Sequence, residues 1–248
     1  MSIEAVIFDL GGTLIEYAGP FAAWPELETP GFMAAYNHLK QAGSAMPKFL
    51  QFREVGFEML PVRWGMASAG ERNLRLVDLL AEVLAACGVN EIPAERLTAA
   101  AKQYQSAVTE QAVVLPNAAE TLAQLKRAGY KIGLVSNTMF SGAAHREDLD
   151  RFGLTGYFDT MLFSADANKW KPTADPFLQV LSELRAAPEA SVYIGDAPDS
   201  DVVGSQRAGM RAIHIVSSQR AHQLNGIRPD AQIHDLAELP PLLASWAN

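Results

Sequence analysis

Three short apolar segments of this 248-residue sequence stop directly before polar residues. The segments are residues 6–8, 131–135 and 191–195, and the polar residues that follow them are Asp9, Ser136 with Asn137, and Asp196 with Asp201. Apolar runs of this length that end abruptly are typical of buried parallel strands. The carboxyl ends of parallel strands meet at one edge of an open sheet, where ligands bind. We therefore expect these side chains to share one crevice.

Three carboxylates gathered at one sheet edge predict a bound cation. Like charges a few ångströms apart raise one another's pKa, and a hard divalent ion relieves this repulsion. Mg²⁺ fits best, because it binds one or two carboxylates and a backbone carbonyl while leaving positions for a phosphate. Lys171 adds a positive charge opposite the metal, and Ser136 with backbone N–H groups can bind phosphate oxygens. The pattern predicts a magnesium site for a phosphorylated substrate.

The order of the elements predicts an α/β fold. Strands alternate with helices before residue 16 and after residue 113, which indicates a doubly wound, parallel, Rossmann-like sheet. Between residues 31 and 110 the apolar residues recur three and four apart, with breaks at residues 43–47, 61–70 and 88–93, so we expect about four helices there. We predict a core of residues 1–15 and 114–248, with an inserted α-helical cap of residues 16–113.

The same patterns predict the local elements. Residues 16–30 carry several prolines and are expected to be irregular. The predicted helices are residues 117–128, 146–152, 175–184 and 202–208. The predicted later strands are residues 160–163 and 211–216, and residues 232–239 are expected to form a short strand and a turn.

Composition limits the partners and the compartment. The net charge of −8 argues against nucleic acid or an anionic membrane surface as partner, because both need a basic face. No apolar run approaches the roughly 20 residues that span a bilayer, and the sequence opens without a secretory signal pattern, so we expect a cytoplasmic protein. The single cysteine, Cys87, is expected to be a small buried apolar residue.

The polar motifs together resemble those of the haloacid dehalogenase superfamily. The first is FDLGGT at residues 8–13, and the second is VSN at residues 135–137. The third is Lys171-Pro172 with DPF at residues 175–177, and the fourth runs from Gly195-Asp196 to Asp201. The helical insertion resembles the C1-type cap that such enzymes carry between the first two motifs.

The resemblance implies roles for these residues in a hydrolase of a small phosphorylated metabolite. It makes Asp9 a nucleophile that forms an aspartyl-phosphate, Ser136 a phosphate ligand and Lys171 the residue that stabilises charge. It makes Asp9, Asp196 and the Gly11 carbonyl magnesium ligands, while Asp201 orients Lys171 or holds a metal-bound water. The other expected phosphate-binding residues are Gly12, Thr13 and Asn137.

Gly11 is the one departure from the phosphatase pattern. Phosphatases of this superfamily usually have a second aspartate there, which protonates the leaving alcohol. Two alternatives therefore stay open. A 2-haloacid dehalogenase expels halide and needs no such acid, although the acidic fourth motif does not suit it. A catalytically weak relative would instead bind a phosphorylated ligand or a partner protein.

A few further residues near these motifs have two interpretations. His145 either touches substrate or lies on a solvated loop, and we favour the loop. Trp170 stacks on a ligand or packs against the sheet edge. Glu16 and Tyr17, directly after the first motif, are better candidates for substrate contact. The large aromatic residues of the cap are expected to be mostly core by their helical spacing, and these are Phe49, Phe52, Phe57 and Trp64.

Overall fold

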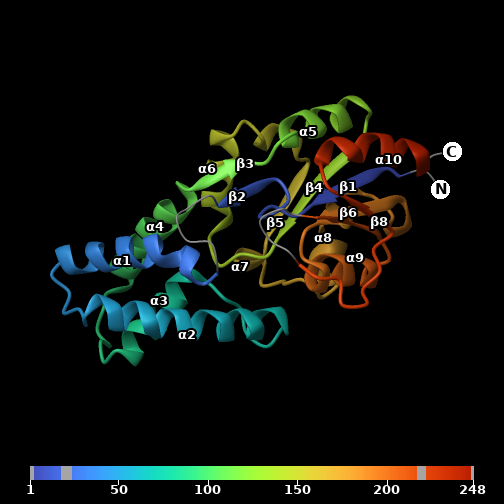
Figure 1. Cartoon of the computed structure of the whole chain (residues 1–248). Helices are drawn as coiled ribbons and strands as arrows, with labels where there is room; N and C mark the ends of the chain where they lie inside the picture. Colours follow the sequence, from blue (N-terminus) through green and yellow to red (C-terminus); the bar gives the residue numbers. More distant parts are fainter. Residues whose placement is uncertain (1–2, 18–23, 217–221, 247–248) are drawn as a thin grey trace.

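The computed structural model describes residues 3–17, 24–216 and 222–246, and its centre is a six-stranded sheet (Figure 1). The strands are all parallel and lie in the order β5-β4-β1-β6-β7-β8. Their bounds are β1 Ala5–Phe8, β4 Lys131–Ser136, β5 Thr160–Phe163, β6 Ser191–Gly195, β7 Arg211–Ile215 and β8 Ala231–Ile233. The chain winds outward from β1 in both directions, which confirms the doubly wound α/β fold.

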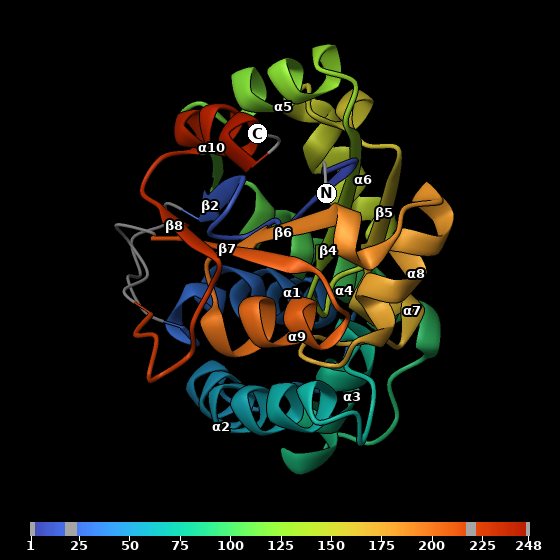
Figure 2. The same ribbon diagram turned by 90° about the vertical axis from the view of Figure 1, so that its right-hand side faces the viewer.

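Helices cover both faces of this sheet (Figures 1 and 2). Successive side chains of a strand point to opposite faces, so a strand of apolar residues has an apolar surface to bury on each side. On β1, Val6 and Phe8 pack with α5 (Ala118–Arg127) and α10 (Leu239–Trp246). Ala5 and Ile7 pack on the opposite face, with α8 (Asp175–Leu184). The first strand is therefore buried on both sides, and Asp9 follows it at its carboxyl end.

In the described part of the insertion, which lies beside the sheet in Figure 1, there are four helices. They are α1 Thr29–Gln41, α2 Phe49–Ser68, α3 Leu76–Ala86 and α4 Ala94–Thr109. The predicted number of helices is confirmed, but the predicted break at Pro61 is wrong, since α2 continues through it. Pro61 lies on the exposed face, while Leu60 and Ala67 on the inner face are buried. Tertiary packing here outweighs the local cost of a proline inside a helix.

Aromatic rings fill the centre of the insertion. The ring of Phe32 makes edge-to-face contacts with Phe52, Phe57 and Tyr104, at centroid distances of 5.6, 5.7 and 5.0 Å. Gly31 lets α1 approach α4, because a Cβ there would lie 2.4 Å from the Tyr104 ring. Phe52 is buried as predicted, whereas Phe49, Phe57 and Trp64 are only partly buried against this core.

A two-stranded ribbon connects the insertion to the core. β2 (Ile15–Tyr17) pairs antiparallel with β3 (Ala112–Val114), so the chain enters and leaves the insertion along neighbouring strands. The sequence prediction of irregular structure was wrong for Glu16 and Tyr17, and residues 18–23 of that segment lie outside the described residues. Three-residue strands are too short to show an alternating pattern, which explains the miss.

The remaining elements differ from prediction mainly at their ends. α6 (Gly142–Arg151) begins four residues before the predicted helix, and the strand and turn predicted for residues 232–239 are followed by a helix, α10, for which no prediction was made. The short elements are α7 Ser164–Ala167, α9 Val203–Arg207 and the single turns η1 Glu26–Glu28, η2 Thr155–Tyr157, η3 Pro188–Ala190, η4 Pro198–Val202 and η5 Leu236–Glu238. The π-helical turn η4 precedes α9 and carries Asp201.

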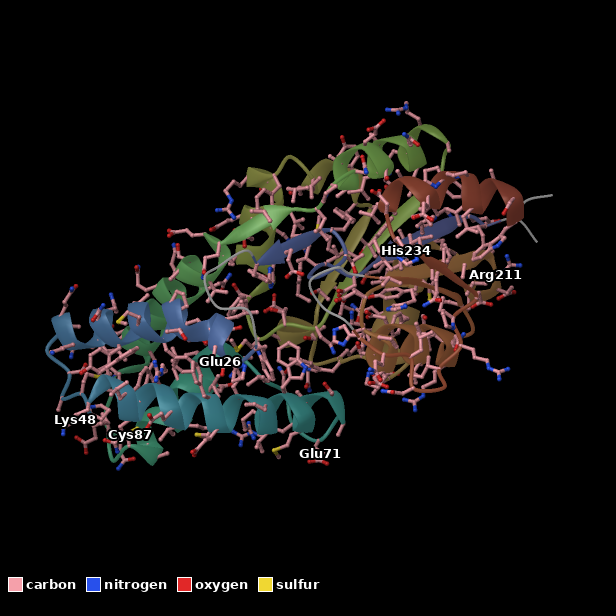
Figure 3. All side chains as sticks on the ribbon, in the orientation of Figure 1. Glu26, Lys48, Glu71, Cys87, Arg211 and His234 are labelled. Atoms are coloured by element: carbon pink, nitrogen blue, oxygen red, sulfur yellow. The ribbon has the colours of Figure 1, made fainter. Side chains whose placement is uncertain are left out.

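Cys87 lies at the end of α3, at the tip of the insertion far from the sheet (Figure 3), and it is half-buried instead of fully buried. Within the described residues, no helix combines the length and the apolar character needed to cross a bilayer.

Candidate active site

A cavity of about 1100 Å³ lies between the carboxyl edge of the sheet and the helical insertion. Asp9, Ser136, Lys171, Asp196 and Asp201 all line it. Each of these side chains is almost fully buried from bulk solvent, with exposed fractions between 1% and 7%. The structure therefore brings together the residues that the sequence placed at one sheet edge.

Lys171 is the centre of the polar network. Its Nζ donates to Asp9 Oδ1 and to Asp201 Oδ1, both at 2.7 Å, and to the Tyr193 hydroxyl at 2.9 Å. The Tyr193 hydroxyl in turn donates to the carbonyl of Val135 at 2.8 Å. Lys171 Nζ also lies 3.3 Å from the Val135 carbonyl oxygen, so the buried charge is fully hydrogen-bonded.

The backbone of Lys171 is fixed by Asn137. The Asn137 side chain accepts from the Lys171 N–H at 2.9 Å and donates to the Lys171 carbonyl at 2.9 Å. Both polar atoms of this amide are used, so the second motif positions the lysine of the third. Asn137 also lines the cavity.

The ionisation of the site follows from burial and from these pairs. Burial raises the pKa of Asp9 to about 6, although Lys171 opposes this effect. Burial also disfavours the charged lysine, but Asp201 and Asp9 together raise the pKa of Lys171 above its ordinary value. At neutral pH the site holds an ionised Asp9 beside a protonated Lys171.

Three carboxylates can approach one cation. Oxygens of Asp9, Asp196 and Asp201 lie within 4.8 Å of one another. Asp201 uses one oxygen for Lys171 and the other to accept from the Ala197 N–H at 2.9 Å. The donor set therefore fits Mg²⁺ through Asp9 and Asp196, with the Gly11 backbone at the same cavity wall.

A histidine absent from the sequence interpretation supports Asp196. Gln232 Nε2 donates to His214 Nδ1 at 3.1 Å, so the proton of this neutral ring is on Nε2, which donates to the Asp196 carbonyl at 3.1 Å. His214 lies on β7 beside β6, so strand pairing places it. No sequence motif distinguishes it from an ordinary core histidine.

Gly12 and Thr13 occupy the turn after β1. Gly12 has φ +83°, and a Cβ there would lie 2.2 Å from Asp196 Oδ2. Only glycine lets the turn pass this close to the carboxylate. Thr13 is fully buried, and neither residue is among the described residues that line the cavity. Gly12 makes room for Asp196.

His145 lies in the site and not on a solvated loop, so that expectation was wrong. It belongs to α6, is 2% exposed and lines the cavity. Its Nε2 lies 2.8 Å from Thr138 Oγ1, and its ring stacks on Phe163 at 5.1 Å. Burial lowers the pKa of His145 to about 4, so it is neutral at physiological pH.

The insertion supplies the opposite wall of the cavity. Glu16 and Tyr17 line it, and so do Trp24, Glu28 and Trp64. Trp170 does not line it. Its ring packs edge-to-face on Trp64 at 5.1 Å, and its Nε1 donates to Asn73 Oδ1 at 2.9 Å. Trp170 therefore packs the core loop against the insertion.

Glu28 is a buried acid that the sequence interpretation missed. It is 9% exposed, and its Oε2 has no hydrogen-bond partner among the described residues. Burial raises the pKa of Glu28 to about 7, and the neighbouring Tyr104 hydroxyl offsets part of this. The glutamate immediately precedes α1, a position that sequence cannot distinguish from ordinary helix capping.

The family model of haloacid dehalogenase-like hydrolases matches residues 3–209. The chain belongs to this family of hydrolases. A ribulose-1,5-bisphosphate 5-phosphatase of Halopiger xanaduensis is 26% identical over 250 residues, which cover 97% of this chain and 99% of that protein. A glyceraldehyde 3-phosphate phosphatase of Methanothermobacter thermautotrophicus is 32% identical over 133 residues, which cover 52% of this chain and 58% of that protein.

The fold of the core and the insertion together resembles that of a solved structure. A 2-haloacid dehalogenase from Pseudomonas syringae pv. tomato superposes with a TM-score of 0.73 and 26% identity, covering 98% of this chain and 99% of that one. The relatives thus include both phosphatases and a dehalogenase. Family membership alone does not choose between these reactions.

Proposed function

We propose that this hydrolase is a Mg²⁺-dependent phosphatase that acts on a small phosphorylated metabolite through an aspartyl-phosphate on Asp9. The observation that carries the proposal is the buried group of three carboxylates with Lys171 in one cavity. Such a group offers a nucleophile, a metal site and a fixed positive charge within reach of one phosphoryl group. The phosphatase names of two relatives support the same reaction class.

In this proposal the Asp9 carboxylate attacks phosphorus, and the bond from phosphorus to the leaving oxygen breaks. Lys171 stabilises the charge that develops on the phosphoryl oxygens, and Ser136 binds one of them. The bound Mg²⁺ would neutralise phosphate charge and orient the phosphoryl group. Water then attacks the aspartyl-phosphate, which releases inorganic phosphate and restores Asp9.

The other predicted residues act through these. Asn137 holds the backbone of Lys171, Asp201 holds its ammonium group, and Gly12 gives Asp196 room to reach the metal. Thr13 is assigned to the turn that sets the backbone N–H groups toward phosphate. We propose that residues 16–113 form the cap that closes this cavity over the substrate, with residues 1–15 and 114–248 as the core.

The Gly11 backbone remains a metal ligand in this proposal, but its missing side chain leaves the leaving oxygen to take its proton from water. General acid catalysis is worth about 10²- to 10⁴-fold in rate, so the enzyme should favour esters with good leaving groups. A halide also leaves without a proton, which keeps 2-haloacid dehalogenation as the second candidate. The structural relative named as a dehalogenase supports that candidate.

One set of assays separates the two reactions. The enzyme is screened against phosphate esters, acyl phosphates and 2-chloropropionate, with Mg²⁺ and with EDTA. We expect Mg²⁺-dependent phosphate release that is lost in Asp9→Asn, and a phosphoryl group on Asp9 detected by mass spectrometry after rapid quenching. Halide release that EDTA does not affect would replace the phosphatase with the dehalogenase.

A further inference from the structure

Acidic residues line both walls of the cavity. Lys171 is the only Lys or Arg among the described residues that line it, and its ammonium protons already contact Asp9, Asp201 and Tyr193. The wall opposite carries Glu16 and Glu28. Among the described lining residues, a second phosphate or a carboxylate on the substrate would therefore meet mainly acids.

Glu28 is the acid that most needs a partner. Glu28 is 9% exposed and is one of the residues that line the cavity, and its buried Oε2 lacks a hydrogen-bond partner among the described residues. A buried carboxylate is costly to ionise, and the Tyr104 hydroxyl offsets only part of that cost, so this position favours a ligand that brings a positive charge. The raised pKa of Glu28, about 7, is the free-state consequence of that burial.

Aromatic rings lie on the same wall. The rings of Trp24 and Trp64 meet edge-to-face at 5.8 Å, and both residues line the cavity with Tyr17. Trp64 is held from behind by the buried Trp170 at 5.1 Å. The faces of tryptophan and tyrosine attract organic cations, most strongly where water is excluded.

From this wall we infer that the substrate is the phosphate monoester of an amino alcohol, whose ammonium group binds between Glu28 and the aromatic rings. The inference rests on the proposed phosphatase function and names its substrate class. The phosphate binds at Asp9 and Lys171, and the cation lies against the insertion. Glu16 and Glu28 disfavour substrates whose organic part carries one or two negative charges.

The test compares two substrates that differ only in charge. Phosphocholine and 3,3-dimethylbutyl phosphate have the same shape, but the second has carbon in place of nitrogen. We expect the wild type to prefer phosphocholine in kcat/KM by about tenfold, the scale of a cation–π contact together with a carboxylate. Glu28→Gln should reduce this preference to about twofold or less, because the amide keeps the shape but not the charge.

Glu26→Gln is the matched control. Glu26 lies two residues earlier in η1, is exposed and does not line the cavity, so the preference should stay at the wild-type value. Trp24→Leu is the second test variant and should lower the preference without removing an acid. Equal kcat/KM for the two substrates in the wild type, or a preference that survives Glu28→Gln, would overturn the inference.

The outcomes also separate the two levels of proposal. If the wild type hydrolyses p-nitrophenyl phosphate with Mg²⁺ but does not prefer the cation, the substrate inference fails and the phosphatase stands. If no phosphate ester is hydrolysed, the phosphatase fails, and calorimetric titration of the wild type with both compounds decides the binding site. Equal affinities for the two compounds in this titration would overturn the inferred cation site, and tighter binding of phosphocholine would support it.

Discussion

Lys171 Nζ lies 2.7 Å from Asp9 Oδ1, although 162 residues separate them in the sequence. The same nitrogen contacts Asp201 at an equal distance, so one buried cation joins the residue that follows β1 to the turn η4. The side chains of Lys171 and Asp201 are 2% and 1% exposed, which makes the group structural as well as chemical. Removing one member leaves charges buried without a partner.

Lys171→Met should therefore lower both stability and activity. Breaking a buried ion pair from one side costs about 3–5 kcal/mol, because the remaining charges stay desolvated. We expect a fall of that size in the free energy of unfolding, measured by urea denaturation at pH 7, and loss of detectable turnover. Part of the stability should return in the double variant Lys171→Met/Asp201→Asn.

Lys169→Met is the control for that pair of measurements. Lys169 is two residues away and donates to the neutral Gln179 side chain at 2.8 Å, so its removal leaves no buried charge. Its effect on unfolding should stay below about 1 kcal/mol, because this partly buried contact joins a solvated charge to a neutral side chain. An equal loss in the two variants would contradict the buried-network account.

Adjacent glycines provide a second prediction. A Cβ at Gly12 would lie 2.2 Å from Asp196 Oδ2 at a φ of +83°, whereas the nearest atom to a Cβ at Gly11 is Tyr17 Cε2 at 3.8 Å. Gly12→Ala should displace Asp196 and raise the Mg²⁺ concentration for half-maximal activity by about 10- to 100-fold, as mutations that move a metal ligand do. Gly11→Ala should have a much smaller effect. Similar Mg²⁺ curves for both variants would argue against Asp196 as a ligand.

The sequence was informative about the fold where patterns are local. The strands β1, β4 and β6 are continuous apolar runs, and α8 was predicted with its observed bounds because its periodicity is unbroken. No helix was predicted at α10, whose first turn contains Pro240 and Pro241, a place where prolines are tolerated. The ribbon of β2 and β3 was missed because its pairing joins residues almost 100 positions apart.

For the site, motifs indicated the residues at the strand ends but not their support. Tyr193 completes the hydrogen bonds of Lys171, and the only sequence hint is a tyrosine inside an otherwise aliphatic strand. His145 was assigned to a loop because polar residues surround it, yet Phe163 packs on its ring. The burial of Glu28 depends on how the start of α1 packs in the folded protein. Such contacts arise from tertiary packing, which no local pattern encodes.

Glu28 makes a prediction about pH and stability. Its pKa is raised from 4.5 to about 7 in the folded protein, so the folded state binds this proton more tightly than the unfolded state. Stability from this group is therefore present below the unfolded pKa and is lost as pH rises through the folded pKa. The loss is on the order of 3 kcal/mol between pH 4.5 and pH 7, at 1.36 kcal/mol per pKa unit.

Glu28→Gln should remove this dependence, since an amide does not titrate. We expect the variant to be more stable than the wild type at pH 8, with the difference shrinking at pH 5, in urea denaturation at both values. Glu26→Gln, at an exposed position of the same turn, should leave the wild-type pH dependence in place. If the difference in unfolding free energy between the wild type and Glu28→Gln is the same at pH 5 and at pH 8, Glu28 keeps an ordinary pKa.

Gly11→Asp tests the missing acid directly. The position has no positive φ, and a Cβ there meets nothing closer than 3.8 Å, so aspartate fits without the backbone strain expected at Gly12. A carboxyl group near the leaving oxygen can donate the proton that water otherwise supplies. The gain should grow with the pKa of the leaving group, up to about 10²- to 10⁴-fold for an alkyl ester and little for p-nitrophenolate.

The measurement is kcat/KM for p-nitrophenyl phosphate and for an alkyl phosphate, each with Mg²⁺ and with EDTA. Gly11→Asn is the matched control, because it has the same size as aspartate but no acidic proton. We expect the alkyl ester to gain in Gly11→Asp and not in Gly11→Asn, which assigns the gain to proton transfer instead of to altered packing. Equal gains on both esters, or equal gains in both variants, would mean that Gly11 limits the reaction by some route other than the absence of a general acid.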